Sequence, residues 1–399
     1  MKYKLGNGLT FILERRKSDS VSIEAMIKVG SNYENKKISG ISHFIEHMVF
    51  KGTKKRNAKD ISSAIENVGG QINAYTSKER TAFFGKVPKK HYLILLNILS
   101  DIIQNPIFDS KELKKEKNVV LSEAKIWKDQ PRLNQWLLLE KILWKKHPSK
   151  NPIVGTVESV KGITRNDVLS YYKKYYTPSN IILSIVGDVD ENILEIIKEK
   201  FGNFKGAKAK IKIFGEEKQN KNNLIKIKKD ILHSYFVIGF LGPNRANSDS
   251  YAFDIIQTLL GYGSSSKLST EIREKRGLCY EIGTNYESEV DFGYFAINLS
   301  TDRKNLELVK KIILEEINKL KKINEEELNK VKESIEGQFL LENENTLKLV
   351  DSICFWERIK DYGLHKEYIN NIKRVTKKDI SKLIDKYFRY NNIVIIEQK

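Results

Sequence analysis

Cysteine is almost absent from this chain. Its 399 residues include two cysteines, Cys279 and Cys354, and neither belongs to a CxxC pair. Two isolated thiols argue against a disulfide framework and a cysteine-ligated metal centre, and they suit a reducing compartment. We therefore expect a cytoplasmic protein in which both cysteines are small residues of the core.

Long apolar segments are missing as well. No run approaches the about 20 apolar residues that a membrane-spanning helix needs. The amino-terminal stretch MKYKLGNGLTFILERR lacks the apolar segment followed by small residues that marks a signal peptide, so it predicts a first strand. With 40% hydrophobic and 30% charged residues, the composition is that of a globular protein. The length suggests two or three domains.

Acidic residues are outnumbered by basic ones. The chain has 70 Lys+Arg against 51 Asp+Glu, a net charge of +19. Such an excess is found in proteins that bind nucleic acid or acidic substrates. Here the lysines are scattered among glutamates, as in KKEKNVVLSEAK, and no RNA- or DNA-binding motif accompanies them. The pattern favours solvated helix faces, and nucleic-acid binding is the weaker alternative.

The chain divides into two halves with a similar order of predicted elements. In each half strand-like segments precede helical ones and then return, which is typical of sheet-and-helix layers. A charged, glycine-containing stretch separates the halves. We predict an α+β fold of two homologous domains, each a sheet with helices packed on one face. The predicted boundaries are 1–205 for the amino-terminal domain, 206–223 for a linker and 224–399 for the carboxy-terminal domain.

Helical periodicity places the local elements. For the helix that begins near residue 110, Asp109 or Ser110 is the candidate N-cap. The stretch QINAYTSKERTAFFGKVP is rich in Tyr, Thr and Phe and predicts strand. The predicted helices cover residues 41–50, 58–68, 89–104, 110–129, 164–175, 190–201, 248–260 and 267–277.

Histidine occurs six times, and two of the six stand one helical turn apart in SHFIEHMVFKGT. On a helix, His43 and His47 lie about 40° apart around the axis, so both imidazoles can point to one metal ion. Zinc is well matched to imidazole nitrogens. Glu46 sits on an adjacent line of the helix, where a carboxylate can accept a proton from an attacking water. The alternative is a surface coincidence, which composition makes about a one-per-cent event.

A catalytic zinc site needs a third protein ligand and an open fourth position. Glu123 is the best candidate, and Glu116 lies on the same helical face because seven residues shift the phase by only about 20°. One carboxylate can ligate while the other orients the site. The two glutamates alone would mean nothing, since this helix is crowded with Lys and Glu.

The stretch GISHFIEHMVFKGT resembles the active-site helix of the pitrilysin/insulinase metallopeptidases, whose HxxEH motif defines the inverzincins. The chain most resembles the branch of mitochondrial processing peptidases and their bacterial relatives. In that family the third zinc ligand is a glutamate 76 residues after the second histidine, which is Glu123 here. A supporting glutamate lies seven residues earlier, at Glu116. The resemblance thus implies one Zn²⁺ per chain, bound by His43, His47 and Glu123.

The resemblance extends to the substrate side of the site. Asn73 and Ala74, in VGGQINAYTSKERTAFFGKV, match family positions that contact the peptide backbone, and Phe50 is assigned to the same role. In STEIREKRGLCYEI, Arg273 and Tyr280 match the family's Arg/Tyr element. The resemblance implies that this arginine holds the peptide and that the tyrosine stabilises the oxyanion.

The sequence therefore predicts a zinc-dependent endopeptidase that cleaves peptides or unfolded segments, with Glu46 as general base. Family members of this length pair to enclose a chamber. Because one chain carries both the metal set and the Arg/Tyr pair, a homodimer is expected, with no membrane partner. The main alternative is a catalytically inactive partner subunit, since some relatives keep the fold and lose the chemistry.

Overall fold

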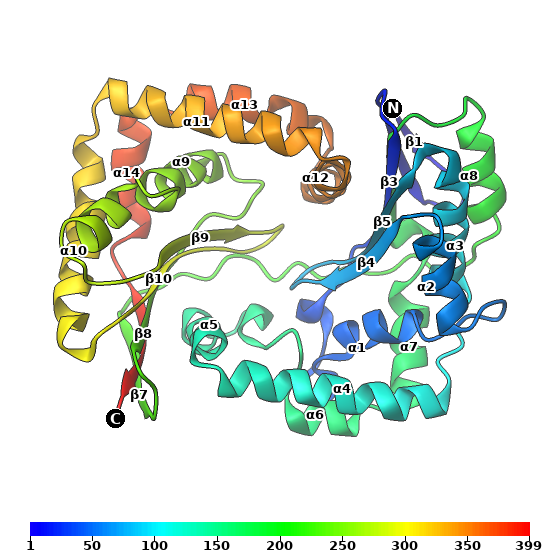
Figure 1. Cartoon of the computed structure of the whole chain (residues 1–399), viewed down its shortest axis with the longest axis horizontal. Helices are drawn as coiled ribbons and strands as arrows, with labels where there is room; N and C mark the ends of the chain where they lie inside the picture. Colours follow the sequence, from blue (N-terminus) through cyan, green and yellow to red (C-terminus); the bar gives the residue numbers. More distant parts are fainter. The chain divides into compact units, whose positions relative to one another are not determined.

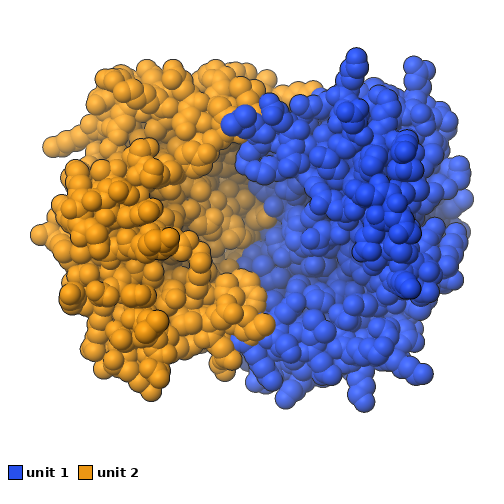
Figure 2. Space-filling view, in the orientation of Figure 1, with its two compact units in different colours: residues 1–125, 151–212, 341–365 blue, residues 126–150, 213–340, 366–399 orange.

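The computed structural model describes all residues, 1–399, and divides them into two compact units. Figure 1 shows the elements and Figure 2 colours the units. Unit 1 consists of 1–125, 151–212 and 341–365, and unit 2 of 126–150, 213–340 and 366–399.

Unit 1 is built on a six-stranded sheet with the strand order β1-β2-β6-β3-β5-β4. Strands β2 and β6 run parallel, and the other neighbours pair antiparallel. Strand β4 lies at one edge and pairs with β5 alone. The strands are Lys2–Lys4 (β1), Thr10–Arg15 (β2), Ser20–Ile27 (β3), Gln71–Thr76 (β4), Thr81–Pro88 (β5) and Ile181–Gly187 (β6).

Residues of β3 alternate between the two faces of this sheet. Val21, Ile23 and Ala25 belong to the main core of the unit, together with apolar residues of α1, α3, α7 and α8. The helices of unit 1 that come from the first half of the chain are Ile41–Val49 (α1), Ala58–Glu66 (α2), Tyr92–Gln104 (α3), Ser110–Asp129 (α4), Val157–Gly162 (α6), Arg165–Tyr175 (α7) and Ile193–Phe201 (α8). Helix α4 continues into unit 2 from Ile126.

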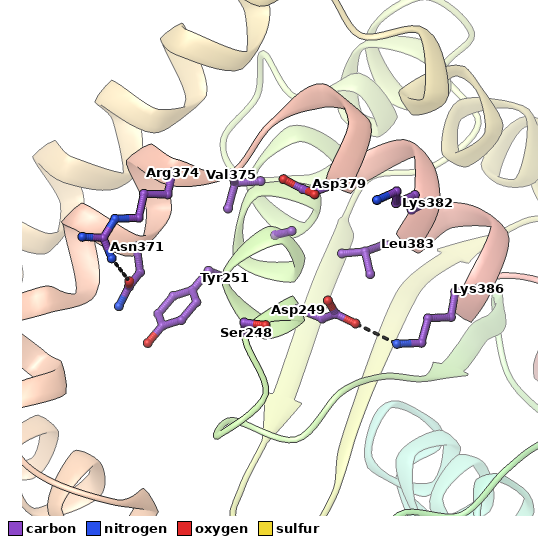
Figure 3. A pocket seen from close by; sticks show the side chains of 11 residues that line it. Ser248, Asp249, Tyr251, Asn371, Arg374, Val375, Asp379, Lys382, Leu383 and Lys386 are labelled. Atoms are coloured by element: carbon purple, nitrogen blue, oxygen red, sulfur yellow. Dashed lines mark hydrogen bonds and ion pairs between the residues drawn. The ribbon is translucent and has the colours of Figure 1, made fainter.

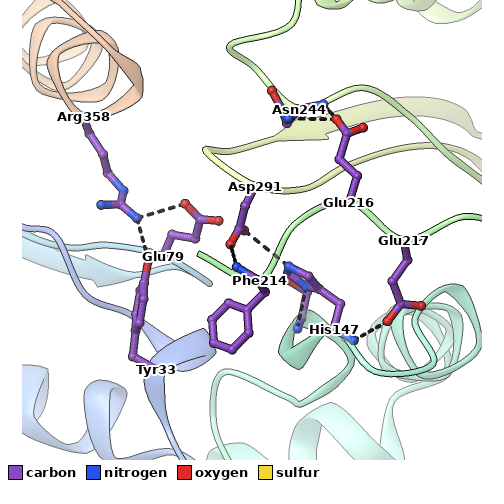
Figure 4. A network of polar contacts seen from close by, with 10 residues as sticks. Tyr33, Glu79, His147, Phe214, Glu216, Glu217, Asn244, Asp291 and Arg358 are labelled. Atoms are coloured by element: carbon purple, nitrogen blue, oxygen red, sulfur yellow. Dashed lines mark hydrogen bonds and ion pairs between the residues drawn. The ribbon is translucent and has the colours of Figure 1, made fainter. Parts of the chain in front are cut away.

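The opposite face of the same sheet is covered by a helix from the second half of the chain, α12 (Thr346–Ile359). Met26 of β3 lies in a core cluster with Val350 and Ile353 of α12. At the other end of the helix, Arg358 donates hydrogen bonds to Glu79 at 2.9 Å and to the Tyr33 hydroxyl at 3.1 Å (Figure 4). A buried ion pair thus anchors the helix beside the apolar contact.

Unit 2 is built on a five-stranded sheet with the order β7-β11-β8-β10-β9. Strands β7 and β11 run parallel, and the remaining pairs are antiparallel. The strands are Asn223–Lys229 (β7), Ser234–Leu241 (β8), Ile282–Ser288 (β9), Gly293–Thr301 (β10) and Asn392–Gln398 (β11).

The two faces of this second sheet are covered in the same manner. One face packs against helices of the second half, and the other against a helix from the first half, α5, through Leu139 and Leu143. The remaining helices are Pro131–Leu143 (α5), Asp249–Gly261 (α9), Leu306–Lys319 (α10), Glu325–Glu344 (α11), Gly363–Arg374 (α13) and Lys377–Tyr387 (α14).

The α+β class and the presence of two sheet-and-helix units are confirmed. The expectation of helices on one face holds for most helices, and one further helix covers the second face of each sheet. The units are also discontinuous in sequence, unlike the predicted domains 1–205 and 224–399. Each half of the chain contributes one helix to the other unit, because both faces of each sheet carry apolar side chains that need cover.

The predicted linker, 206–223, contains no helix or strand before Asn223, where β7 begins. Ile211 packs against the core of unit 1. In unit 2, Phe214 donates its backbone N–H to Asp291 at 2.7 Å, and Glu217 accepts backbone N–H groups from residues 145–147 (Figure 4). Each end of the segment is therefore fixed to its own unit.

Asp109 is the cap of α4, since its carboxylate accepts the backbone N–H groups of Lys111 and Glu112 at 2.8 and 3.1 Å. Strand β7 begins at Asn223, the last residue of the predicted linker, and otherwise lies within the predicted carboxy-terminal domain. None of the helices combines the length and apolar character needed to cross a membrane.

Candidate metal centre

The helix that carries the HxxEH motif, α1, is held by its first turn. Gly40 is its N-cap with φ +93°, and an added Cβ there would lie 2.8 Å from the Val154 carbonyl oxygen. Glu34 accepts the backbone N–H groups of Gly40 and Ser42 at 2.6 and 2.8 Å. Two of the donors at the start of the helix are thereby satisfied by one half-buried carboxyl group.

The helix is also held by its buried face. Ile41, Phe44, Ile45 and Met48 are at most 1% exposed, and they recur at the three- and four-residue spacing of one helical face. His43 and His47 occupy the adjacent, half-buried stripe. The core packing therefore fixes which way the two imidazoles point.

Glu34 makes this helix start sensitive to pH. Burial raises the pKa of the Glu34 carboxyl to about 8, although the N–H groups of Ser42 and Gly40 favour its charged form. An unfolded glutamate titrates near about pH 4.3, so between that pH and about 8 the folded protein holds a proton that the unfolded chain lacks. The free energy of unfolding therefore falls as pH rises through this window.

We expect Glu34→Gln to remove this part of the pH dependence. Urea unfolding of the metal-free protein at about pH 5 and about pH 8.5 measures it, because the wild type should lose more stability between the two pH values than the variant does. Equal losses in the two proteins would contradict the assignment of the raised pKa to Glu34.

Three side chains converge beside α1. The Nε2 atoms of His43 and His47 lie 3.6 and 3.7 Å from the Oε2 atom of Glu123. One ligand atom from each residue falls within 4.8 Å of the other two, and all three side chains are half-buried. Two imidazole nitrogens and one carboxylate oxygen are the donor set of known catalytic zinc sites. The residues present therefore fit a zinc ion.

Helix α4 supplies both Glu116 and Glu123. Glu123 faces the Nε2 atoms, while Glu116, two turns earlier, has its Oε2 atom 3.1 Å from Nδ1 of His47. The second oxygen of Glu116 lies 2.7 Å from Nζ of Lys51. One carboxylate thus lies beside the Nε2 atoms of both histidines, and the other lies beside Nδ1, on the far side of the His47 ring.

Burial sets the charge of this group. Burial, together with charge repulsion from His47, lowers the pKa of His43 to about 4, so His43 is neutral at physiological pH and its ring nitrogen can ligate. Burial also raises the pKa of Glu46, against the hydrogen bond from Thr76 and the charge of His47. A raised pKa suits a group that must accept and return a proton.

Glu46 is connected to the edge strand of the sheet. Its Oε2 atom accepts a hydrogen bond from the Thr76 hydroxyl at 2.6 Å, and Thr76 is the last residue of β4. Asn73 and Ala74 lie earlier in the same strand, Asn73 exposed and Ala74 half-buried. Because β4 pairs with β5 alone, its other edge offers backbone groups to an added strand.

Phe50 is the C-cap residue of α1. Its ring lies 6.0 Å from that of Phe83 in β5, and it is half-buried against the core of unit 1. Phe50 thus lies at the end of the helix that carries His47, and its ring packs against Phe83 of the sheet.

Arg273 and Tyr280 belong to unit 2. Arg273 lies in a π-helical turn, Ser269–Glu274, where the sequence predicted an ordinary helix. Its guanidinium carbon is 5.7 Å from the centre of the Tyr280 ring, and Tyr280 is 86% exposed. The two residues stand together at the surface of their unit, and their contact with substrate stays a prediction.

Three residues at this site were not found from the sequence: Thr76, Lys51 and Glu34. Lys51 follows His47 by four positions, so the helical spacing could have indicated it. Glu34 stands six residues before Gly40, which does not match a capping box. Thr76 meets Glu46 only through the pairing of sheet and helix, and no local pattern indicates that contact.

A separate pocket of about 430 Å³ lies in unit 2 between α9, α13 and α14 (Figure 3). Lys386 pairs there with Asp249 at 2.8 Å, and Arg374 donates to Asn371 at 3.2 Å. No histidine or cysteine lines it. The pocket therefore has neither the nitrogen nor the sulfur ligands of a zinc site and lies outside the candidate centre.

Comparison with known proteins shows the family of this chain. Residues 10–157 match the family model of insulinase (peptidase family M16), and residues 162–335 match that of the peptidase M16 inactive domain. The uncharacterized zinc protease YmxG of Bacillus subtilis is 32% identical over 349 residues, which cover 86% of this chain and 85% of the relative. The chain belongs to the insulinase family, peptidase family M16.

A further relative and two solved structures extend the comparison. An uncharacterized zinc protease of Rickettsia felis is 38% identical over 324 residues, covering 79% of this chain and 77% of the relative. A protease from Helicobacter pylori, of known crystal structure, has a TM-score of 0.94 at 24% identity and covers 100% of this chain and 99% of its own. A peptidase M16 inactive domain from Pseudomonas fluorescens has a TM-score of 0.90 at 20% identity, covering 100% and 98%. These two structures share the two-domain α+β fold.

Proposed function

We propose that this insulinase-family protein is a zinc-dependent endopeptidase acting on peptides or unfolded segments. The observation that carries the proposal is the convergence of His43, His47 and Glu123 beside Glu46. A zinc ion held by these three residues would polarise the scissile carbonyl and lower the pKa of a water at the open position.

The remaining chemistry belongs to side chains of the protein. Glu46, held at Oε2 by Thr76, accepts a proton from the attacking water and later returns it to the leaving amine. Glu116 accepts the Nδ1–H of His47 and so directs the Nε2 lone pair of that ring towards Glu123. His43 needs no proton transfer, because burial already keeps its imidazole neutral.

The substrate is proposed to bind as a strand added to β4, beside Asn73 and Ala74. Phe50 is assigned an apolar contact with a substrate side chain. Arg273 and Tyr280 are assigned to the peptide backbone and the oxyanion, and their exposure in unit 2 leaves both available.

The alternative function is an inactive partner subunit, since one of the two matching family models is named an inactive domain. That match covers residues 162–335, whereas all the proposed metal ligands lie within residues 10–157, in the other match. The set of His43, His47, Glu123 and Glu46 is also complete in this chain. The residues therefore favour the active peptidase.

The experiment that tests the proposal combines metal analysis with cleavage. The purified protein should contain about one zinc per chain, as a site of three protein ligands binds one ion. It should cleave members of a peptide library, lose this activity to a chelator, and regain it with added zinc. A protein that binds zinc but cleaves nothing in the library would support the inactive subunit.

We also propose a homodimer, because each chain carries both the metal set and the Arg273–Tyr280 pair. Light scattering under the conditions of the cleavage assay should give about twice the mass of one chain. A monomer that is fully active would contradict this assembly, and activity that appears only with an unlike subunit would do so as well.

A further inference from the structure

Lys51, Glu116 and His47 form a chain of polar contacts that ends at the candidate metal centre. Nζ of Lys51 lies 2.7 Å from Oε1 of Glu116, and Oε2 of Glu116 lies 3.1 Å from Nδ1 of His47. The side chain of Glu116 is 9% exposed, so its charge is largely withdrawn from water. Each carboxylate oxygen thus has its own partner on α1 or just after it.

We propose that Lys51 is a positioning residue for the metal centre, which acts on His47 through Glu116. A carboxylate bound at one oxygen can still rotate about its side-chain bonds, whereas a carboxylate bound at both oxygens is fixed in plane and direction. The ring of His47 takes its orientation from that carboxylate. Lys51 therefore determines how firmly the Nε2 atom of His47 is held towards Glu123.

The backbone geometry places Lys51 for this contact. Lys51 directly follows Phe50, the C-cap residue of α1, and its backbone N–H donates to the Met48 carbonyl at 3.1 Å. It stands in the turn just beyond the helix, and from there its Nζ atom reaches Oε1 of Glu116. The lysine and the histidine thereby reach the two oxygens of one glutamate on α4.

The neighbouring lysine Lys55 shows that the lysines after α1 do not all pair with a buried carboxylate. Lys55 is exposed and takes part in no ion pair, while the side chain of Lys51 is 31% exposed and is paired with a buried carboxylate. An exposed ion pair contributes little, but removing the partner of a buried carboxylate leaves its charge uncompensated. Lys55 therefore serves as a matched control of equal charge and similar position.

The inference rests on the proposed function in one respect only: it takes His43, His47 and Glu123 as the ligands of a zinc ion. It predicts that Lys51→Met raises the zinc dissociation constant about tenfold, at the lower end of the effect of outer partners in other zinc sites. Lys51→Arg should recover most of the affinity, since arginine keeps the charge and the donor groups. Lys55→Met should bind zinc as the wild type does.

A double-mutant cycle separates this role from a merely structural one. The zinc dissociation constants of the wild type, Lys51→Met, Glu116→Gln and the double variant are measured by competition with a chromophoric chelator. If Lys51 acts through Glu116, the double variant should bind zinc no more weakly than Glu116→Gln alone, within about a factor of two. Thermal unfolding of each metal-free variant confirms that it is folded.

The outcomes are distinguishable. Equal zinc affinity of Lys51→Met and the wild type overturns the inference and leaves the proposed peptidase untouched. Additive losses in the double variant also overturn it, because Lys51 would then act independently of Glu116. Failure of the wild type to bind zinc overturns the proposed function together with the inference.

Discussion

Replacing Glu46 by glutamine should leave zinc bound and lower kcat for peptide cleavage by about 10²–10⁴-fold, the usual contribution of a general base. Glutamine keeps the size of the side chain and an oxygen that can accept the Thr76 hydrogen bond. It cannot accept a proton from water at neutral pH. KM should change little, because the peptide contacts assigned to Asn73 and Ala74 are unaltered.

Zinc retention follows from the geometry. The three ligand atoms belong to His43, His47 and Glu123, and Glu46 is not among them. The matched control is Glu66→Gln, the same change at an exposed position near the end of α2, which should keep full activity. Elemental analysis and steady-state kinetics on one peptide provide both measurements. Full activity of Glu46→Gln would exclude the proposed mechanism.

Replacing Glu123 by glutamine should instead remove the metal. The neutral amide is a poor zinc ligand, and the two histidines would remain as the only protein ligands. The loss of zinc affinity should exceed the about 10–100-fold cost of losing an outer partner, which is the range expected for Glu116→Gln. Both substitutions change a glutamate of the same helix to glutamine. A difference between their losses of zinc affinity therefore reflects only where each carboxylate lies relative to the metal.

The measurement is zinc per chain after dialysis against a weak chelator, with circular dichroism to show that α4 is intact. Glu123 is half-buried and its removal creates no unpaired buried charge, so the variant should remain folded. If Glu116→Gln lost more zinc than Glu123→Gln, the roles of the two glutamates would be reversed.

Sequence reasoning predicted the local elements well where the pattern was periodic. Helices α1, α3, α4 and α7 lie close to their predicted bounds, because amphipathic spacing and capping residues such as Asp109 act locally. It did not predict strand β7, whose alternating Lys and Ile residues resemble the charged linker before them. It also missed the exchange of α5 and α12 between units, since amphipathic helices carry no signal for which sheet they cover.

The residues of the candidate site likewise fall into those that the sequence could indicate and those that it could not. The convergence of His43 and His47 follows from helix geometry, and Glu123 from a long-range spacing that only the family resemblance could supply. Lys51 and Thr76 touch the site through tertiary contacts with Glu116 and Glu46. Such contacts depend on how α4 and β4 pack beside α1, which a single sequence does not specify.

The position of α12 has a consequence for the order in which the protein is made. Residues 346–359 leave the ribosome after two of the three segments of unit 2, yet they cover one face of the sheet in unit 1. Until then that face exposes the apolar side chains of Ile12, Met26, Ile182 and Val186. A nascent or prematurely terminated chain thus presents a bare apolar sheet that favours aggregation. The unit carrying the candidate metal ligands is completed only when residues up to 365 have been synthesised, which couples formation of the candidate site to synthesis of nearly the whole chain.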